Sequence, residues 1–227
     1  MQGKVLSIYE KLYSKFGPQK WWPTTLPGET EPTYNGITPD DKGRFEIAIG
    51  AILTQNTSWT NVIKAISDLN MLNLISPYKI LDADKEILIN AIRPSGYFNQ
   101  KYIKLINLSH WWQKNFITID LGSAKLAYIN RTRDSLLEIN GVGPETADSI
   151  LLYSFDMPSF VIDTYTKRIL ARHYAVNPEI KYDHLRSIFM SELPKSAELY
   201  KEYHALIVEL GKNHCKKSNC FTSCPLR

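Results

Sequence analysis

The chain has 227 residues, of which 44% are hydrophobic and 22% charged, and it carries a formal net charge of +4. This composition is that of a globular protein with one large domain or two small ones, and it excludes a disordered or fibrous chain. No apolar run could span a bilayer, and the first residues lack the apolar core of a signal peptide. We therefore expect a cytoplasmic protein with no membrane partner. The small basic excess permits a polyanionic partner but does not require one.

The predicted elements are almost all helices. Residues 45–54 are nearly all apolar and predict a buried helix, and residues 61–72 carry apolar side chains at helical spacing. A serine and a proline begin a helix that we expect over residues 76–92, and residues 93–96 (Arg-Pro-Ser-Gly) end it. Further helices are predicted at 102–112, 134–139, from 145 onward, and at 164–174, 182–193 and 197–210.

Residues 21–39 interrupt this pattern early in the chain. They contain four prolines and two glycines, which indicates an irregular connector. No strand hairpin and no internal repeat are evident in the sequence. The predicted fold class is therefore all-α.

A glycine turn, Gly141-Val142-Gly143, lies between two of the predicted helices. Glycine adopts backbone angles that other residues resist, and it lets the chain approach a ligand closely. The helix that begins near Glu145 would point its free N–H groups back at the turn, which suits an anion such as a DNA phosphate. An ordinary corner between two helices is the alternative, and a bare Gly-X-Gly by itself favours that corner.

The surrounding sequence resembles a known family. Residues 137–147 (LEINGVGPETA) and 161–164 (VIDT) are similar to the helix–hairpin–helix and the following aspartate of the endonuclease III superfamily of DNA glycosylases. Residues 45–46, 53–57, 96–101 and 211–226 resemble further blocks of that family in the same order. The resemblance implies that double-stranded DNA containing damaged bases is the partner. It also implies that the hairpin contacts the DNA through Gly141, Val142, Gly143, Glu145 and Thr146.

Asp163 stands just before a predicted helix, so an N-cap is its simplest role. A carboxylate that accepts backbone N–H bonds has its ionised form favoured, and it therefore stays negative at neutral pH. Such an anion suits a reaction that builds positive charge on a sugar, as glycosidic cleavage does. The resemblance implies that Asp163 is the catalytic carboxylate.

Glu145 occupies the position at which the bifunctional members of the family carry a lysine. That lysine forms a Schiff base with the sugar and permits strand cleavage, whereas a carboxylate cannot form an imine. Lys167 follows Asp163 by four residues and should point along its own helix, so it is a poor substitute. The sequence therefore predicts simple hydrolysis that leaves an abasic site.

One branch of the family is especially similar, namely the 3-methyladenine DNA glycosylases of the endonuclease III type. The similarity lies in residues 21–23 (Trp-Trp-Pro), in residues 93–100 and in the glutamate of the hairpin. An N3-alkylated adenine is cationic and binds well against aromatic faces. Trp21, Trp22 and Phe45 are the candidates for its pocket, and packing in the protein core is their alternative role.

An enzyme that acts on a base within a duplex must flip the base out of the stack. The resemblance implies that Gln55 fills the gap. Its loop, residues 53–59, is too polar for the middle of a protein core. Asn56 is a second candidate, and Phe98 is a candidate on the opposite strand. An exposed loop glutamine without a DNA contact is the alternative.

Three cysteines, Cys215, Cys220 and Cys224, lie in the last thirteen residues. Their spacing is C-x4-C-x3-C, whereas the family's [4Fe–4S] cluster loop reads C-x6-C-x2-C-x5-C, so that a fourth cysteine would fall beyond Arg227. His214 is a conceivable fourth ligand, and the other histidines show no metal-ligand spacing. A loop without metal, a cluster with an unusual ligand and a shortened sequence all remain open.

The fold that the resemblance implies has two helical domains with the DNA between them. One comprises residues 36–157, and the other combines residues 1–35 with 158–227. The predicted function is base-excision repair by a monofunctional DNA N-glycosylase, with an alkylated purine as its substrate. The alternatives are an endonuclease III-like enzyme for oxidised pyrimidines and a non-catalytic DNA-binding module. A monomer is the default.

Overall fold

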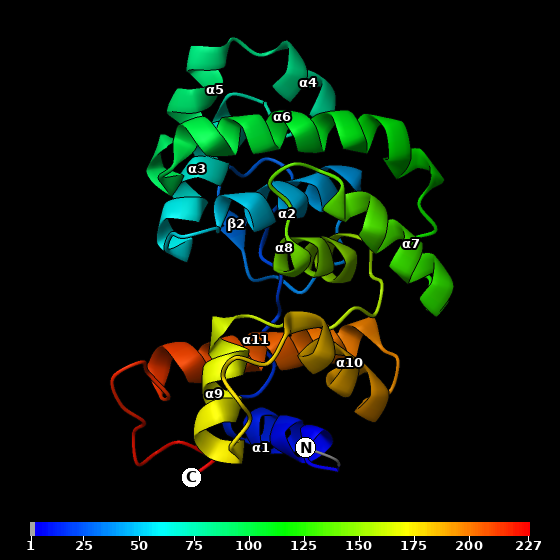
Figure 1. The fold of residues 1–227 in the computed structure, drawn as a ribbon. Coiled ribbons are helices and arrows are strands. Elements are labelled where there is room, and N and C mark those ends of the chain that lie inside the picture. The colour runs from blue at the N-terminus through cyan, green and yellow to red at the C-terminus, as the bar shows by residue number, and fades with distance from the viewer. Residues whose placement is uncertain (1–2) are drawn as a thin grey trace.

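A computed structural model describes residues 3–227 of the protein. They form two helical lobes, one above the other in Figure 1. The fold class is all-α, as the sequence predicted. The upper lobe contains α2 (Asp41–Leu53), α3 (Trp59–Met71), α4 (Pro77–Asp82), α5 (Lys85–Ile92), α6 (Phe98–Asn115), α7 (Leu126–Leu137) and α8 (Pro144–Ser149). The lower lobe contains α1 (Val5–Phe16), α9 (Thr164–Tyr174), α10 (Tyr182–Glu192) and α11 (Ala197–Asn213).

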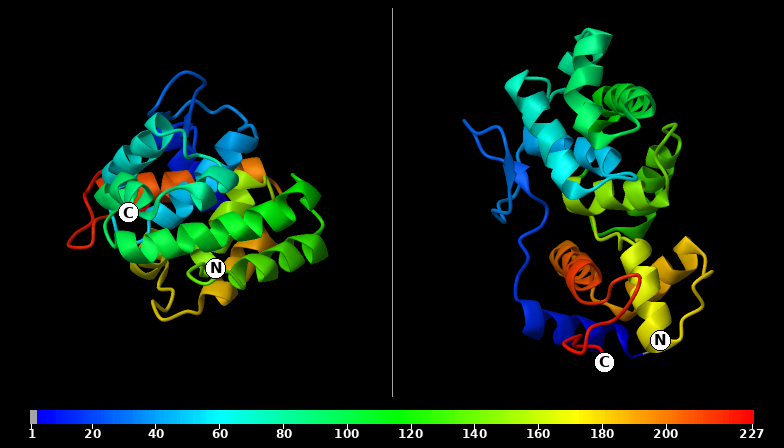
Figure 2. Two further views of the ribbon diagram at one scale, coloured as in Figure 1. Left: turned by 90° about the horizontal axis from the view of Figure 1, so that it is seen from above. Right: turned by 90° about the vertical axis from the view of Figure 1, so that its left-hand side faces the viewer.

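The connector between α1 and α2 contains one small strand pair that the sequence analysis did not predict. Strands β1 (Thr24–Thr25) and β2 (Pro32–Thr33) pair antiparallel, at the side of the upper lobe in the right-hand view of Figure 2. Two-residue strands are too short to show the alternation that marks a strand in a sequence. The pair is held to α2 because Glu46 accepts a hydrogen bond from the Thr25 N–H at 2.7 Å.

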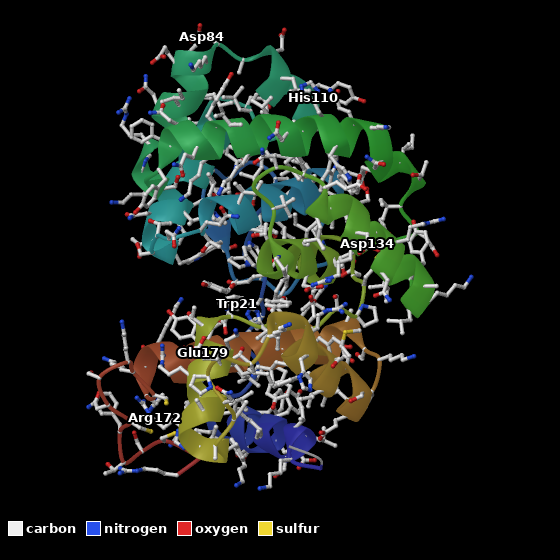
Figure 3. All side chains as sticks on the ribbon, in the orientation of Figure 1. Trp21, Asp84, His110, Asp134, Arg172 and Glu179 are labelled. Atoms are coloured by element: carbon white, nitrogen blue, oxygen red, sulfur yellow. The ribbon has the colours of Figure 1, made fainter. Side chains whose placement is uncertain are left out.

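The helix expected over residues 76–92 is divided into α4 and α5. Asp84, at the top of Figure 3, causes the division because its Oδ1 accepts the N–H groups of Glu86 and Ile87 and so caps a new helix. Short 3₁₀ turns at Arg93–Ser95 and Phe116–Thr118 flank α6, and a π-helical turn at Ile150–Ser154 continues α8. Within residues 3–227, no helix combines the length and the apolar character needed to cross a membrane.

The buried apolar side chains form two clusters. The first surrounds α2, which is buried along almost its whole length, as its apolar sequence predicted. The second joins α1 to α9, α10 and α11, and it also takes in Tyr153 of the π turn. Trp22 packs against both clusters. On the family resemblance we propose two domains, residues 36–157 and residues 1–35 with 158–227, and the strand pair within residues 1–35 packs on α2 across that boundary.

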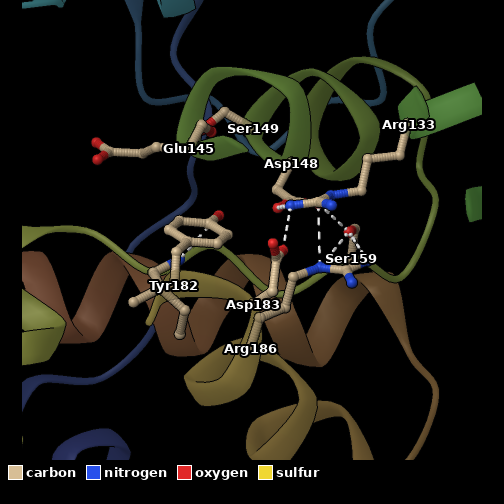
Figure 4. A network of polar contacts seen from close by, with 9 residues as sticks. Arg133, Glu145, Asp148, Ser149, Ser159, Tyr182, Asp183 and Arg186 are labelled. Atoms are coloured by element: carbon tan, nitrogen blue, oxygen red, sulfur yellow. Dashed lines mark hydrogen bonds and ion pairs between the residues drawn. The ribbon is translucent and has the colours of Figure 1, made fainter. Parts of the chain in front are cut away.

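A buried ion network joins the two lobes (Figure 4). Asp148 of α8 lies fully buried and is bound by Arg133 of α7 at 3.0 Å and by Arg186 of α10 at 3.1 Å. Ser159 donates a hydrogen bond to the same carboxylate. Arg133 also reaches Asp183 of α10, whose side chain is 66% exposed. The network fixes the lower lobe against the helix that follows the glycine hairpin.

Candidate active site and DNA interface

Asp163 caps the N-terminus of α9, as the sequence suggested. Its Oδ1 accepts hydrogen bonds from the N–H and the hydroxyl of Thr166, both at 2.7 Å. Its Oδ2 lies 3.7 Å from the Nε2 of His204 on α11. One carboxylate oxygen is therefore held by the helix, and the other stays available for chemistry.

The surroundings of Asp163 decide its charge. Burial alone would raise the pKa of this carboxyl, but the imidazole of His204 and the two donors of Thr166 outweigh burial and hold the pKa below its ordinary value. At 3.7 Å, the His204 nitrogen acts through its charge and dipole rather than through a normal hydrogen bond. Asp163 is therefore a buried carboxylate that is ionised at neutral pH.

His204 is a functional candidate that the sequence analysis read as structural. Its Nδ1 lies 2.7 Å from the hydroxyl of Tyr153, and its Nε2 is buried without a hydrogen-bond partner among residues 3–227. Tyr153 Oη also donates to the carbonyl of Lys201 at 3.2 Å. The tyrosine therefore holds the imidazole so that its second nitrogen faces Asp163. One indication of this role was present in the sequence, namely a histidine within the helix predicted at residues 197–210.

Glu145 lies in the first turn of α8, and its side chain extends away from the ion network in Figure 4. It is solvent-exposed, but protein atoms surround it on several sides. The resulting loss of hydration raises its pKa to about 7, the negative charge of Asp163 adds to this effect, and His204 opposes it. Two carboxyls whose pKa values move in opposite directions thus lie close together, which is a common arrangement in sites that handle protons.

Trp21 and Trp22 lie beside the Tyr153–His204 pair. The ring of Trp21 is 5.9 Å from His204 and 6.2 Å from Tyr153, and the ring of Trp22 is 5.1 Å from Tyr153. Trp21 stands between the lobes in Figure 3. A pocket of about 320 Å³ beside Trp21 is lined by Tyr34 and Lys212 among others. The structure therefore brings both tryptophans to the surroundings of Asp163.

Phe45, the third residue predicted for the base pocket, lies elsewhere. It is 1% exposed and packs against Trp112, with 5.0 Å between the rings. A larger pocket of about 560 Å³ reaches Phe45 and Trp112 but contains neither tryptophan of the pair nor Asp163. Trp22 packs on α2 at Gly50, which lies five residues after Phe45. Because an α-helix has 3.6 residues per turn, Phe45 and Gly50 lie on different sides of α2. We therefore propose that Phe45 packs in the core and does not line a base pocket beside Asp163.

Gln55 follows α2 and contacts the glycine hairpin. Its Nε2 donates to the carbonyl of Gly141 at 3.2 Å and to the hydroxyl of Thr146 at 3.0 Å, and Lys104 donates to its Oε1. Asn56 beside it is exposed and has a positive φ of 54°. The Gln55 side chain must leave these partners if it is to enter a duplex.

A buried lysine that the sequence analysis did not single out supports this loop. Lys101 Nζ donates to the carbonyls of Leu53 and Ser95, both at 2.7 Å. Burial lowers the pKa of Lys101 to about 8, and the charge of Lys104 adds to the effect. Phe98 begins α6 in the neighbouring loop, half-buried, with the guanidinium of Arg93 4.6 Å from its ring centre. Lys101 thus joins the two loops that carry Gln55 and Phe98.

The backbone of the glycine hairpin requires glycine at its first position, Gly141. Gly141 has a φ of +98°, and a Cβ there would lie 2.4 Å from Cγ of Lys104. Val142 between the glycines is buried, whereas Gly143 and Glu145 are exposed. Gly143 adopts extended backbone and precedes α8 directly. The turn is therefore anchored by its valine and presents its second glycine to solvent.

The three cysteines converge on a histidine that the sequence analysis read as structural. His173, near the end of α9, has its Nε2 3.5 Å from Cys215 Sγ, 3.6 Å from Cys220 Sγ and 3.7 Å from Cys224 Sγ. His214, the fourth ligand considered from the sequence, instead lies 3.3 Å from the Ser223 hydroxyl. His173, Cys220 and Cys224 have donor atoms within 4.8 Å of one another and could bind a metal ion, with Cys215 Sγ beside the same imidazole nitrogen.

This arrangement of a helical hairpin, a capping aspartate and two helical lobes defines a class of DNA repair protein, and comparisons with known proteins agree. A family model described as the HhH-GPD superfamily of base excision DNA repair proteins matches residues 49–195. The chain belongs to this superfamily.

Three relatives illustrate the match. A protein from Methanocaldococcus jannaschii, named provisionally as a DNA repair glycosylase, is 43% identical over 98% of this chain and 94% of its own length. Endonuclease III of Sulfolobus acidocaldarius is 31% identical over 76% of this chain and 74% of its own. The solved structure of Helicobacter pylori 3-methyladenine DNA glycosylase bound to 1,N6-ethenoadenine has a TM-score of 0.67 and 28% identity, covering 91% of this chain and 96% of its own.

Proposed function

We propose that the protein is a monofunctional DNA N-glycosylase, which hydrolyses the glycosidic bond of a damaged base flipped out of double-stranded DNA. The observation that carries the proposal is Asp163, a buried carboxylate whose pKa is held low and whose Oδ2 is free of helix hydrogen bonds. As the base departs, its sugar gains oxocarbenium character, and an anion fixed beside it stabilises that charge. The same oxygen orients the water that completes hydrolysis.

The proposed DNA contacts follow from the family match and from where the residues lie. Gln55 and Asn56 would fill the space of the flipped base, and Phe98 would contact the opposite strand. The hairpin would contact the sugar-phosphate backbone through Gly141, Val142, Gly143, Glu145 and Thr146. Such backbone contacts position the enzyme without reading sequence. We also propose that the protein acts in the cytoplasm, as a monomer.

We propose an alkylated purine such as 3-methyladenine as the base. Two observations support this choice. Trp21 and Trp22 offer aromatic faces beside Tyr153 and His204, and a cationic alkylated base binds such faces well. The 28% identical Helicobacter pylori structure is a 3-methyladenine glycosylase. An oxidised pyrimidine is the second candidate, because a 31% identical relative is named endonuclease III.

We propose that the enzyme has no lyase activity, because Glu145 stands where the bifunctional members of the family carry a lysine. A lyase needs an amine that attacks the sugar, and Glu145 occupies the place of that amine. Lys167 is engaged elsewhere, with its Nζ donating to the carbonyl of Ile180 at 2.9 Å. Borohydride added during turnover of a damaged duplex should therefore leave no covalent protein–DNA adduct, whereas endonuclease III, run in parallel, should give one. An adduct of the wild-type protein would show that an amine attacks the sugar.

A pH effect on DNA binding is expected from Glu145. Because its pKa is raised to about 7, Glu145 changes from mostly neutral to mostly anionic as the pH rises from 6 to 8. A new negative charge beside DNA phosphates weakens binding, so the Kd for a duplex with an abasic-site analogue should rise over this interval. In Glu145→Gln, that part of the rise in Kd should vanish. The variant should therefore bind more tightly than the wild type at pH 8, and the difference should be smaller at pH 6. Equal pH profiles for the two proteins would mean that Glu145 does not approach the DNA.

A further inference from the structure

The donor atoms around His173 are spaced for one metal ion and not for an iron–sulfur cluster. Zinc bonds of about 2.3 Å to sulfur and about 2.0 Å to nitrogen place a sulfur and a nitrogen of one tetrahedral ion about 3.5 Å apart. The three Cys Sγ to His173 Nε2 distances are 3.5, 3.6 and 3.7 Å. The His173, Cys220 and Cys224 donor atoms also lie within 4.8 Å of one another, whereas Cys215 Sγ is not part of that group. Cys215 joins the site through its 3.5 Å approach to His173 Nε2.

A [4Fe–4S] cluster does not fit this spacing. Each of its four irons takes one protein ligand, so the ligand atoms stand around the outside of a cage of eight atoms. Here a single imidazole nitrogen lies within 3.7 Å of all three thiol sulfurs, which leaves no room for inorganic sulfides between them. The residues therefore do not match the cofactor that the family resemblance implied, and no step of the reaction passes through a cluster.

The backbone around the cysteines is held in place by α9 itself. Arg168 donates to the carbonyls of Gly211 and Cys215, and Arg172 donates to those of Lys216, Lys217 and Asn219. Arg172, labelled beside the C-terminal tail in Figure 3, also lies 3.2 Å from Cys215 Sγ. Three thiolates around a divalent ion carry one net negative charge, which this guanidinium would balance.

We propose that His173, Cys215, Cys220 and Cys224 bind one tetrahedral divalent ion, with zinc as the natural occupant. The set of one imidazole and three thiolates is a ligand set of closed, structural zinc sites. The ion fastens the C-terminal tail to the last turn of α9, the helix whose first turn is capped by Asp163. It takes no part in the glycosylase reaction, and it stabilises the folded protein because the unfolded chain does not present its ligands together.

Metal content of the full-length protein tests the proposal. Protein purified from cells supplied with both iron and zinc should contain one zinc per chain, little iron and no acid-labile sulfide, and it should lack visible absorption. A strong chelator should remove the zinc and lower the Tm by several degrees, and added Zn²⁺ should restore it. Iron with acid-labile sulfide, or a metal-free protein whose Tm ignores added Zn²⁺, would overturn the proposal.

Substitution of the two nearby histidines tests which of them is the fourth zinc ligand. His173→Ala should lose zinc, whereas His214→Ala, a change at the histidine next to Cys215, should retain it. Replacing zinc by Co²⁺ should give the intense visible bands of a tetrahedral thiolate site in the wild type. His173→Cys should keep the ion and shift those bands, so a ligand role is separable from a folding defect. Retention of zinc and an unchanged Co²⁺ spectrum in His173→Ala would refute the assignment of His173.

Discussion

Replacing Asp163 by asparagine is expected to lower the rate of base release by about 10²–10³-fold, the usual effect of removing one fixed electrostatic group from a transition state. Asparagine keeps an Oδ1 that can accept the Thr166 N–H, so the helix cap and the fold should survive. The variant lacks the negative charge that the sugar cation requires. Single-turnover kinetics on a duplex that contains the damaged base would measure the change.

Two controls make this result specific to the site. Asp134→Asn, at an exposed position of α7, should release the base at the wild-type rate. Binding of Asp163→Asn to a duplex with an abasic-site analogue should stay within a few-fold of wild type. If Asp163→Asn retained full activity, the chemistry would belong to another group, and the role proposed for the capping carboxylate would be lost.

Removing the Asp148 side chain should destabilise the protein more than any other single change that we consider. Asp148 is fully buried and binds both Arg133 and Arg186. In Asp148→Ala, the buried Arg186 loses its carboxylate partner, and Arg133 keeps only the exposed Asp183. Breaking a buried ion pair in this way costs about 3–5 kcal/mol. Urea unfolding followed by circular dichroism should show the loss as a lower midpoint with a similar slope.

Asp183→Ala is the matched control for that prediction. Asp183 also binds Arg133, at 2.7 Å, but its side chain is 66% exposed. Exposed ion pairs contribute about 0–1 kcal/mol, so this variant should unfold near the wild-type midpoint. A loss for Asp148→Ala as small as the one expected for Asp183→Ala would mean that the buried carboxylate does not hold the lobes together.

Local patterns in the sequence were enough to predict much of the fold. Helical periodicity predicted the all-α class. The nearly continuous apolar sequence of α2 predicted its burial, because buried positions favour apolar residues. The division at Asp84 was not predicted. Aspartate is a common N-cap residue, and Asp84 accepts the N–H groups of the residues two and three positions later in the chain. Helix α1 was also not predicted, since its buried stripe rests on only Val5, Ile8 and Leu12.

The candidate site was harder to predict, because its parts come from distant segments. A motif marked Asp163, but His204 lies 41 residues later in the chain and belongs to no motif. His173 is 42 residues before the first cysteine, so ligand spacing along the chain could not reveal it. Phe45 was placed in the pocket on residue type alone, and the turn of α2 carries it into the core instead.

The measurement that tests the proposed function most directly is base release from two duplexes, one with 3-methyladenine and one with thymine glycol, each split between alkaline and neutral work-up. We predict release of 3-methyladenine, with strand breaks only after alkali and none from Asp163→Asn. Strand cleavage at thymine glycol without alkali would contradict this prediction, because that product requires an amine nucleophile and a different base pocket.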